Sequence, residues 1–174
     1  GVPNMARAVE LDPQLLARDP PAAAPRLEYL LSIGASELGP MVGNVPQVLT
    51  CDVQHDLHRK MAILSAIGVH RSGRWVEKNP WIVTMDVESS MRPAIELLRS
   101  VDGLHVGKTV GALPSTIFKS PPEQLRAKLE YMTELGIPVG RLGTFVNRWP
   151  QLLGYSLESA LKPKVEWLRS IGVE

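Results

Sequence analysis

The chain has 174 residues, of which 44% are hydrophobic and 21% are charged, and this composition is typical of a folded protein rather than a disordered one. Nineteen basic residues oppose eighteen acidic ones, so a net charge of +1 excludes a strongly basic protein, and any basic face must come from charge sorting. The single cysteine, Cys51, excludes an internal disulfide, and no apolar run approaches the roughly 20 residues that span a bilayer.

The first recurring element along the chain is a proline followed by a short, mostly apolar step. The prolines recur every 33, 34, 34 and 36 residues, at Pro13, Pro46, Pro80, Pro114 and Pro150. A fixed period of this size is typical of a solenoid built from one supersecondary unit. Because each step is too short for an α-helix, it predicts a single 3₁₀ turn.

A long helix is predicted after each turn. An aspartate or serine suited to a helix N-cap stands six residues after each proline, and a glycine that suits a helix C-terminus follows roughly 15 residues later. The pairs are Asp19 and Gly34, Asp52 and Gly68, Asp86 and Gly103, Ser120 and Gly136, and Ser156 and Gly172. Ser120 and Glu123 also have the spacing of a capping box. A bend is predicted where prolines interrupt these helices, at Pro25, Pro93 and Pro163.

A shorter, glycine-rich helix is predicted between each glycine and the next proline, over residues 36–45, 69–79, 104–113 and 139–149. Glycine weakens an isolated helix by about 1 kcal/mol relative to alanine, so neighbouring repeats must hold these helices by close approach. The resulting fold class is an all-α solenoid. It has a partial repeat over residues 1–34 and full repeats over about 35–68, 69–103, 104–136 and 137–172. The last copy stops where another short helix should begin, so we expect a piece of a longer protein.

Basic residues follow the repeat in two rows. The long-helix row lies in the middle of the long helices and comprises Arg26, Arg59, Lys60, Arg92, Arg126, Lys128, Lys162 and Lys164. The short-helix row comprises Arg71, Arg74, Lys78, Lys108, Arg141 and Arg148. Either row could track a phosphate backbone and release its counterions. The alternatives are weak surface pairs, such as Arg126 with Glu130, for the first row and a solvated face for the second.

Catalysis finds little support in the sequence. The four histidines do not have the spacing of a catalytic or metal-binding motif. His55 and His58 would need further ligands from elsewhere in the chain to hold a metal ion. No glycine-rich phosphate loop is present. We therefore expect no enzymatic activity, no cofactor and no metal. The aromatic residues Tyr29, Tyr131 and Trp167 share one register position with Ile63, which is typical of a core position.

The segment from Pro150 to Gly172 resembles the repeat of the mTERF family, the mitochondrial transcription termination factors, in its plant and algal organellar form. The segments from Asn44 to Thr50 and from Leu125 to Gly136 resemble it too. The resemblance implies two antiparallel helices and a 3₁₀ turn per repeat, stacked into a curved, left-handed superhelix. It also implies nucleic-acid binding on the concave face and a role in organellar gene expression.

On this resemblance and the basic rows we predict a monomer that binds double-stranded DNA and regulates transcription, with termination as the first choice. The expected compartment is the mitochondrion before the chloroplast, without membrane association. Two alternatives stay open. One is RNA binding for organellar splicing or ribosome assembly, and the other is a helical-repeat scaffold that binds a protein partner.

Overall fold

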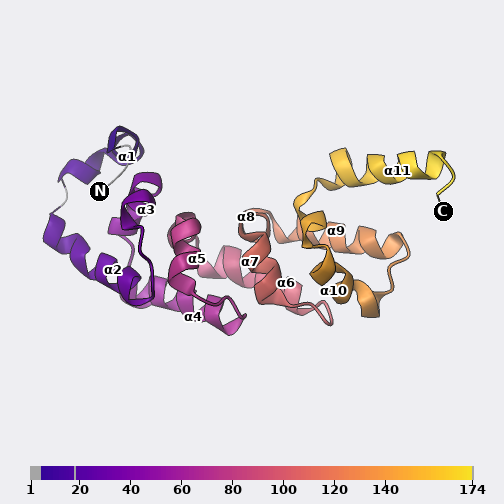
Figure 1. Cartoon of the computed structure of the whole chain (residues 1–174), viewed down its shortest axis with the longest axis horizontal. Coiled ribbons are helices and arrows are strands. Elements are labelled where there is room, and N and C mark those ends of the chain that lie inside the picture. Colours follow the sequence, from indigo (N-terminus) through magenta and orange to yellow (C-terminus); the bar gives the residue numbers. More distant parts are fainter. Residues whose placement is uncertain (1–4, 18, 174) are drawn as a thin grey trace. The chain divides into compact units, whose positions relative to one another are not determined.

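The structure is a computed structural model that describes residues 5–17 and 19–173; residues 1–4 of the predicted first repeat lie outside this description. The described residues form helices and turns and no strand, which confirms the all-α fold class (Figure 1). The chain divides into two compact units, Gly1–Val87 and Glu88–Glu174.

The N-terminal unit alternates short and long helices as the glycines and caps predict. The short helices are α1 (Met5–Leu11), α3 (Leu38–Asn44) and α5 (Ser72–Lys78). The long helices are α2 (Pro20–Ser32) and α4 (His58–Ala66), the second of which continues a π-helical turn, η3 (Val53–Leu57). Three 3₁₀ turns begin at the predicted prolines: η1 (Pro13–Ala17), η2 (Pro46–Leu49) and η4 (Pro80–Thr84).

The C-terminal unit repeats this order. Its long helices are α6 (Arg92–Arg99), α9 (Pro122–Glu134) and α11 (Lys162–Ser170), and its short helices are α7 (Val106–Ala112) and α10 (Val139–Arg148). The π turn η5 (Val87–Met91) leads into α6 and η7 (Leu157–Leu161) into α11, while η6 (Pro150–Gly154) is a 3₁₀ turn. After Pro114 the predicted 3₁₀ turn is wrong, because α8 (Pro114–Lys119) is an α-helix whose added length brings Phe118 into the core.

The predicted helix ends are confirmed most clearly at the glycines. All five have positive φ, at Gly34 (94°), Gly68 (89°), Gly103 (73°), Gly136 (94°) and Gly172 (88°). Two predicted N-caps accept a main-chain N–H, namely Asp52 from His55 and Ser156 from Ser159. Asp19 holds the N-cap position without a side-chain bond. The Ser120–Glu123 capping box is absent, because the proline pair after Ser120 delays the start of α9 to Pro122.

The prolines of the long helices occupy two different kinds of position, one in a helix interior and the other in a first turn. Pro25 lies within α2 as predicted. Pro93 and Pro163 are the second residues of α6 and α11, so the prediction of a proline in the middle of an α-helix is wrong there. In the first turn the missing N–H of proline costs no α-helical bond. A π turn precedes each of these two helices, as the 3.0 Å bond from the Leu161 N–H to the Ser156 carbonyl oxygen shows in η7.

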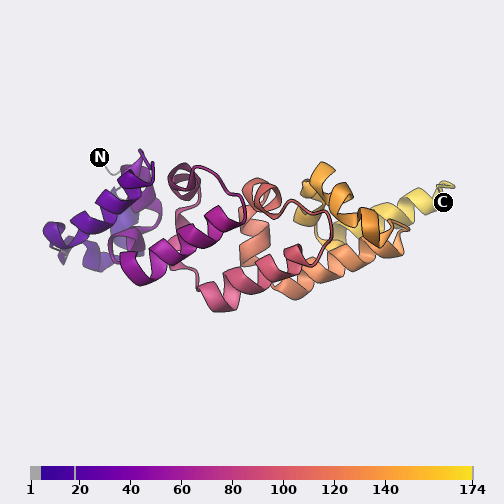
Figure 2. The ribbon, with the colours of Figure 1, turned by 90° about the horizontal axis from the view of Figure 1, so that it is seen from below.

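Within each unit the long helices run in one layer and the short helices in another (Figure 2). Neighbouring short helices touch, α3 with α5 and α7 with α10. The close approach predicted from glycine is present at Gly73 and Gly143, since a Cβ at either position would overlap main-chain atoms at the end of α2 or α6. Two helices therefore meet at each of these glycines with no room for a side chain.

Candidate nucleic-acid interface

Two residues of the long-helix row are buried and do not face solvent. Only 1% of Lys60 is exposed, and its Nζ donates to the main-chain carbonyl of Val83 at 2.8 Å and to the Asp56 carboxylate at 2.6 Å. Only 7% of Lys128 is exposed, and its Nζ donates to the Leu153 carbonyl at 2.6 Å. Burial lowers the pKa of Lys128, because the charged ammonium loses hydration. The expectation that these two lysines lie on an exposed basic row is wrong.

Lys164 occupies the same register position as the buried lysines, fourteen residues after its proline, and Arg26 lies one position earlier in its own repeat. Arg26 is half-buried, and its Nε donates to the Cys51 carbonyl at 2.9 Å. The Lys164 ammonium is exposed and lies 4.5 Å from the centroid of the Tyr155 ring, a cation–π contact. These four cations therefore make local contacts within the protein.

Two other members of the long-helix row are paired with acids in the π turn that precedes their helix. The Arg92 Nε lies 2.7 Å from the Glu88 carboxylate, and the Lys162 Nζ lies 2.6 Å from that of Glu158. Each carboxylate raises the pKa of its basic partner. Surface pairs with a four-residue spacing are thus present, but the acid precedes the cation in both, and the expected pair of Arg126 with Glu130 does not form among the described residues. Arg59 and Arg126 are exposed on α4 and α9.

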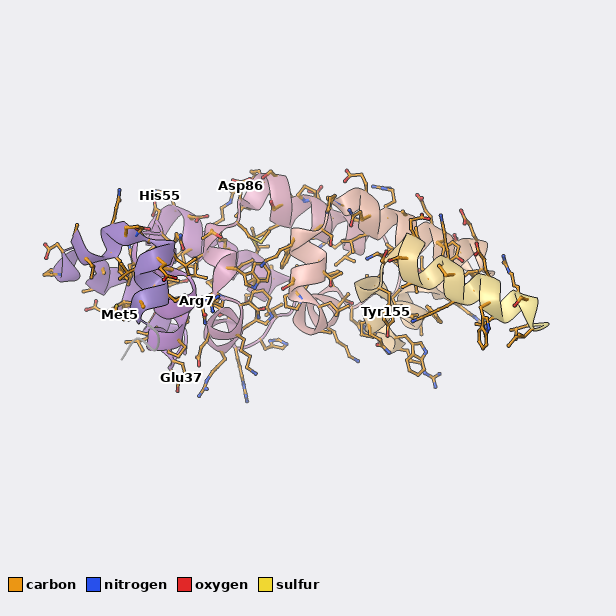
Figure 3. All side chains as sticks on the ribbon, turned by 90° about the horizontal axis from the view of Figure 1, so that it is seen from above. Met5, Arg7, Glu37, His55, Asp86 and Tyr155 are labelled. Carbon is orange, nitrogen blue, oxygen red and sulfur yellow. The ribbon has the colours of Figure 1, made fainter. Side chains whose placement is uncertain are left out.

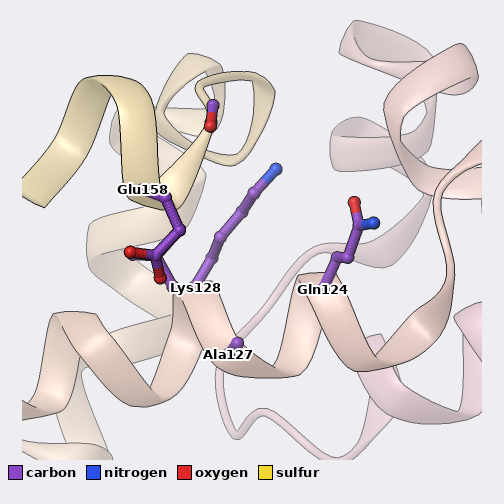
Figure 4. A pocket seen from close by; sticks show the side chains of 6 residues that line it. Gln124, Ala127, Lys128 and Glu158 are labelled. Atoms are coloured by element: carbon purple, nitrogen blue, oxygen red, sulfur yellow. The ribbon is translucent and has the colours of Figure 1, made fainter.

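A groove runs beside the long helices where each meets the cap of the next repeat. In the C-terminal unit it encloses about 360 Å³ between α9 and η7, and Lys128, Ser156 and Glu158 line it (Figure 4). Its counterpart in the N-terminal unit is lined by Arg26, Asp52 and His55, among others. A carboxylate borders both grooves, which disfavours phosphate there.

The short-helix row is exposed in both units. In the N-terminal unit Arg74 and Lys78 lie on α5, and Arg71 is the residue before it. In the C-terminal unit the exposed members are Lys108 on α7 and Arg141 and Arg148 on α10. Among the described residues, Arg71, Arg74, Lys78, Lys108 and Arg141 make no ion pair.

Arg71 is held in an unusual backbone conformation. Its φ of 55° lies in the left-handed region, which costs a residue with a Cβ about 1–2 kcal/mol. It is the one non-glycine residue with positive φ among those that the structure describes. Such strain is often found at functional positions.

Acidic residues are sorted away from the short helices that follow α1. The helices α3, α5, α7 and α10 together contain one acid, Glu77, whose carboxylate accepts the Ser36 main-chain N–H at 3.0 Å. The long helices and π turns carry Glu28, Asp56, Glu88, Glu96, Glu123, Glu130, Glu134, Glu158 and Glu166. Figure 3 shows His55 and Asp86 on one side of the N-terminal unit, opposite Glu37, which precedes α3. The net charge of the whole chain is near zero, but the short helices are basic from α5 onward.

One exposed aromatic residue adjoins the short-helix row. Trp149 follows α10 directly and is 45% exposed, and the Arg148 guanidinium lies 5.5 Å from its ring centroid. The core role predicted for the shared aromatic position holds only in part: Tyr29 and Tyr131 are half-buried, whereas Trp167 is 60% exposed. Trp149 thus offers a flat π-face beside a fixed positive charge.

In the part of the chain that the structure describes, no three histidine, cysteine, aspartate or glutamate side chains gather in a way that could hold a metal ion. No helix there is long and apolar enough to cross a bilayer.

The repeated short helix, proline turn and long helix define an α-helical repeat protein. Residues 27–174 match the model of the mTERF family, and the chain belongs to this family. A search of curated proteins finds no match. Proteins of the mTERF family bind nucleic acid and act in the regulation of transcription.

Proposed function

We propose that this protein binds duplex DNA through the short-helix row and regulates transcription, with termination as the first choice, in an organelle and as a non-enzymatic monomer. The observation that carries the proposal is the charge sorting between the two layers. The exposed cations of the short helices have few acidic neighbours, so phosphates can approach them without repulsion. Most cations of the long-helix row are already engaged within the protein.

The role of each set of cations follows from this sorting. Arginine and lysine on the short helices would contact phosphates and release counterions, which gives affinity without sequence information. Arg141 and Arg148 lie seven residues apart on α10, two helical turns, so the two side chains share one face. A single duplex backbone can contact both.

The test compares binding to duplex DNA, single-stranded DNA and RNA over a salt titration. A double variant, Lys108→Gln with Arg141→Gln, removes two short-helix charges in the C-terminal unit. The matched control, Arg99→Gln with Arg126→Gln, removes two exposed charges from the long helices of the same unit. We expect the first variant to bind duplex DNA more weakly. The slope of the logarithm of its binding constant against the logarithm of the salt concentration should become shallower by up to about 0.9 for each phosphate that it no longer neutralises. An equal or larger effect of the control would reject the proposed face.

A second candidate function is the binding of unpaired RNA or DNA, and the exposed Trp149 favours it. An aromatic side chain stacks on any base, at about 1–3 kcal/mol per base. In the same titration, Trp149→Leu should weaken binding to single strands more than binding to a duplex if this candidate holds. Equal losses would assign Trp149 to a general packing role.

A further inference from the structure

Thr144 interrupts the short-helix row in the C-terminal unit. It stands six residues before the proline of its repeat, and the same register position carries Arg74 and Lys108 in two other repeats. Its side chain is exposed on α10, and its hydroxyl makes no hydrogen bond within the part of the chain that the structure describes. An available hydroxyl therefore lies where other repeats place a cation.

Two arginines flank Thr144 on the same side of α10. Arg141 precedes it by three residues and Arg148 follows it by four, and side chains at these spacings are neighbours on a helix surface. The Thr144 Oγ1 also lies beside Gly103, in the turn after α6, where the missing side chain leaves room. A phosphoryl group on this oxygen would thus have two guanidinium partners and no side chain of residue 103 in its way.

The residues before Thr144 match a pattern that protein kinases select. Thr144 is the one serine or threonine of the chain that stands three residues after a lysine or arginine. Kinases that read charge patterns bind such a basic side chain in an acidic pocket, and calmodulin-dependent kinases also bind an apolar side chain two residues earlier. Val139 holds this earlier position and is 73% exposed. Both recognition residues are therefore present on one segment.

The same segment has the composition of one that opens locally. A kinase binds its substrate in an extended conformation, so residues 139–144 must leave α10 during the reaction. Gly140 and Gly143 lie in this stretch, and glycine weakens a helix relative to alanine. Local opening of the first turns of a helix requires much less than global unfolding.

We propose that Thr144 is a phosphorylation site, and that its modification by a protein kinase and a nucleoside triphosphate releases the C-terminal unit from duplex DNA. This inference rests on the function proposed above. In the reaction a bond forms between the Thr144 Oγ1 and the γ-phosphorus, and the bond from that phosphorus to the β–γ bridging oxygen breaks. The nucleoside diphosphate leaves with the electron pair, and the hydroxyl proton goes to the carboxylate base of the kinase.

Phosphorylation reverses the charge at the centre of the exposed side of α10. The phosphate carries a charge of about −1.5 to −2 at pH 7, and Arg141 and Arg148 donate to its oxygens. Both arginines are then withdrawn from the DNA backbone, and the added negative charge repels it. The affinity for duplex DNA falls for both reasons.

The test treats the 174-residue protein with magnesium ATP and a calmodulin-dependent protein kinase. Mass spectrometry should find one added phosphoryl group, on Thr144, and Thr144→Ala should take up none. The modified protein should bind duplex DNA at least about tenfold more weakly than the unmodified protein. The slope of its binding constant against salt, on logarithmic scales, should become shallower by up to about 1.8, because two arginines leave the interface.

Three variants separate the effect of charge from those of shape and position. Thr144→Glu adds a negative charge to the short-helix layer and should weaken duplex binding at least about threefold. Thr144→Gln has the same size without the charge and should bind like the unmodified protein. Gln124→Glu adds the same charge at an exposed position of α9, in the long-helix layer, and should change binding little.

Failure of the phosphorylation switch can be told apart from failure of DNA binding. The switch is overturned if the kinase leaves Thr144 unmodified, if modified and unmodified proteins bind duplex DNA equally, or if Gln124→Glu weakens binding as much as Thr144→Glu. An unmodified protein that binds no duplex DNA would instead reject the proposed function, and the switch with it, even where mass spectrometry finds the phosphoryl group on Thr144.

Discussion

The ammonium nitrogen of Lys60 lies 2.8 Å from the main-chain carbonyl oxygen of Val83, and this bond joins the long helix of one repeat to the proline turn of the next. Lys128 and Leu153 make the same connection at 2.6 Å in the C-terminal unit. A buried lysine at this position therefore stabilises the stacking of repeats, and a cation that the sequence suggests for phosphate binding holds the protein together.

Replacement of Lys60 by methionine should lower stability without weakening nucleic-acid binding. Methionine keeps the length of the side chain, but it leaves the Val83 carbonyl without its donor and Asp56 without its partner. A buried acceptor left unsatisfied costs about 1–3 kcal/mol. We expect a loss of that size in the free energy of unfolding, measured by urea denaturation. Lys78→Met, at an exposed position on α5, should change stability by less than about 0.5 kcal/mol.

Lys128 should make stability depend on pH in the alkaline range. Burial lowers its pKa in the folded protein below the ordinary lysine value of 10.5, so the unfolded chain binds more protons between these two values. The free energy of unfolding therefore rises with pH in that window. Relative to Lys128→Met, the unmodified protein should gain stability from the lowered pKa up to about pH 10.5. A difference between the two that stays constant with pH would contradict this account.

The spacing of the prolines is enough to predict the repeat, the five helix ends at glycine and the short helices. These features depend on the local conformational preferences of proline and glycine. Burial of the cations depends on tertiary packing, and the prediction of an exposed long-helix row is wrong for that reason. A signal is nevertheless present at the register position of Lys60 and Lys128: the third repeat has Ala94 there, 1% exposed. An apolar residue at a position that carries lysine in three other repeats indicates an interior site, where a phosphate contact is excluded.

The charge sorting cannot be predicted from composition, since it depends on which side of each helix faces the neighbouring repeat. Both basic rows keep the repeat register, and the register alone offers no reason to choose between them. The structure separates them by pairing: Arg92 and Lys162 have acidic partners one turn earlier, whereas Arg74 and Arg141 have none among the described residues. The π turns before α6 and α11 are not predicted either, because the proline that follows each is expected in a helix interior.

Two arginine-to-glycine changes three residues apart should have opposite effects on stability. Arg71 has a φ of 55°, and glycine adopts this conformation without a steric penalty, so Arg71→Gly should raise the free energy of unfolding by up to about 1 kcal/mol. Arg74 lies within α5, where glycine costs about 1 kcal/mol, so Arg74→Gly should lower it. Both changes remove one positive charge and should weaken DNA binding to a similar degree. A stability loss at Arg71 equal to that at Arg74 would show that the left-handed conformation carries no strain.

Two glycine-to-alanine changes within α10 test the close packing of the short helices. A methyl group at Gly143 would overlap the Asp102 carbonyl and the Leu104 main chain, so Gly143→Ala should destabilise the protein by about 1–3 kcal/mol as α10 is forced away from the end of α6. Gly140 has open space around it, and alanine there should add up to about 1 kcal/mol through helix propensity. Urea denaturation of both variants measures the difference. If Gly143→Ala were as stable as Gly140→Ala, α10 would not approach α6 closely, and the glycine would serve helix flexibility instead.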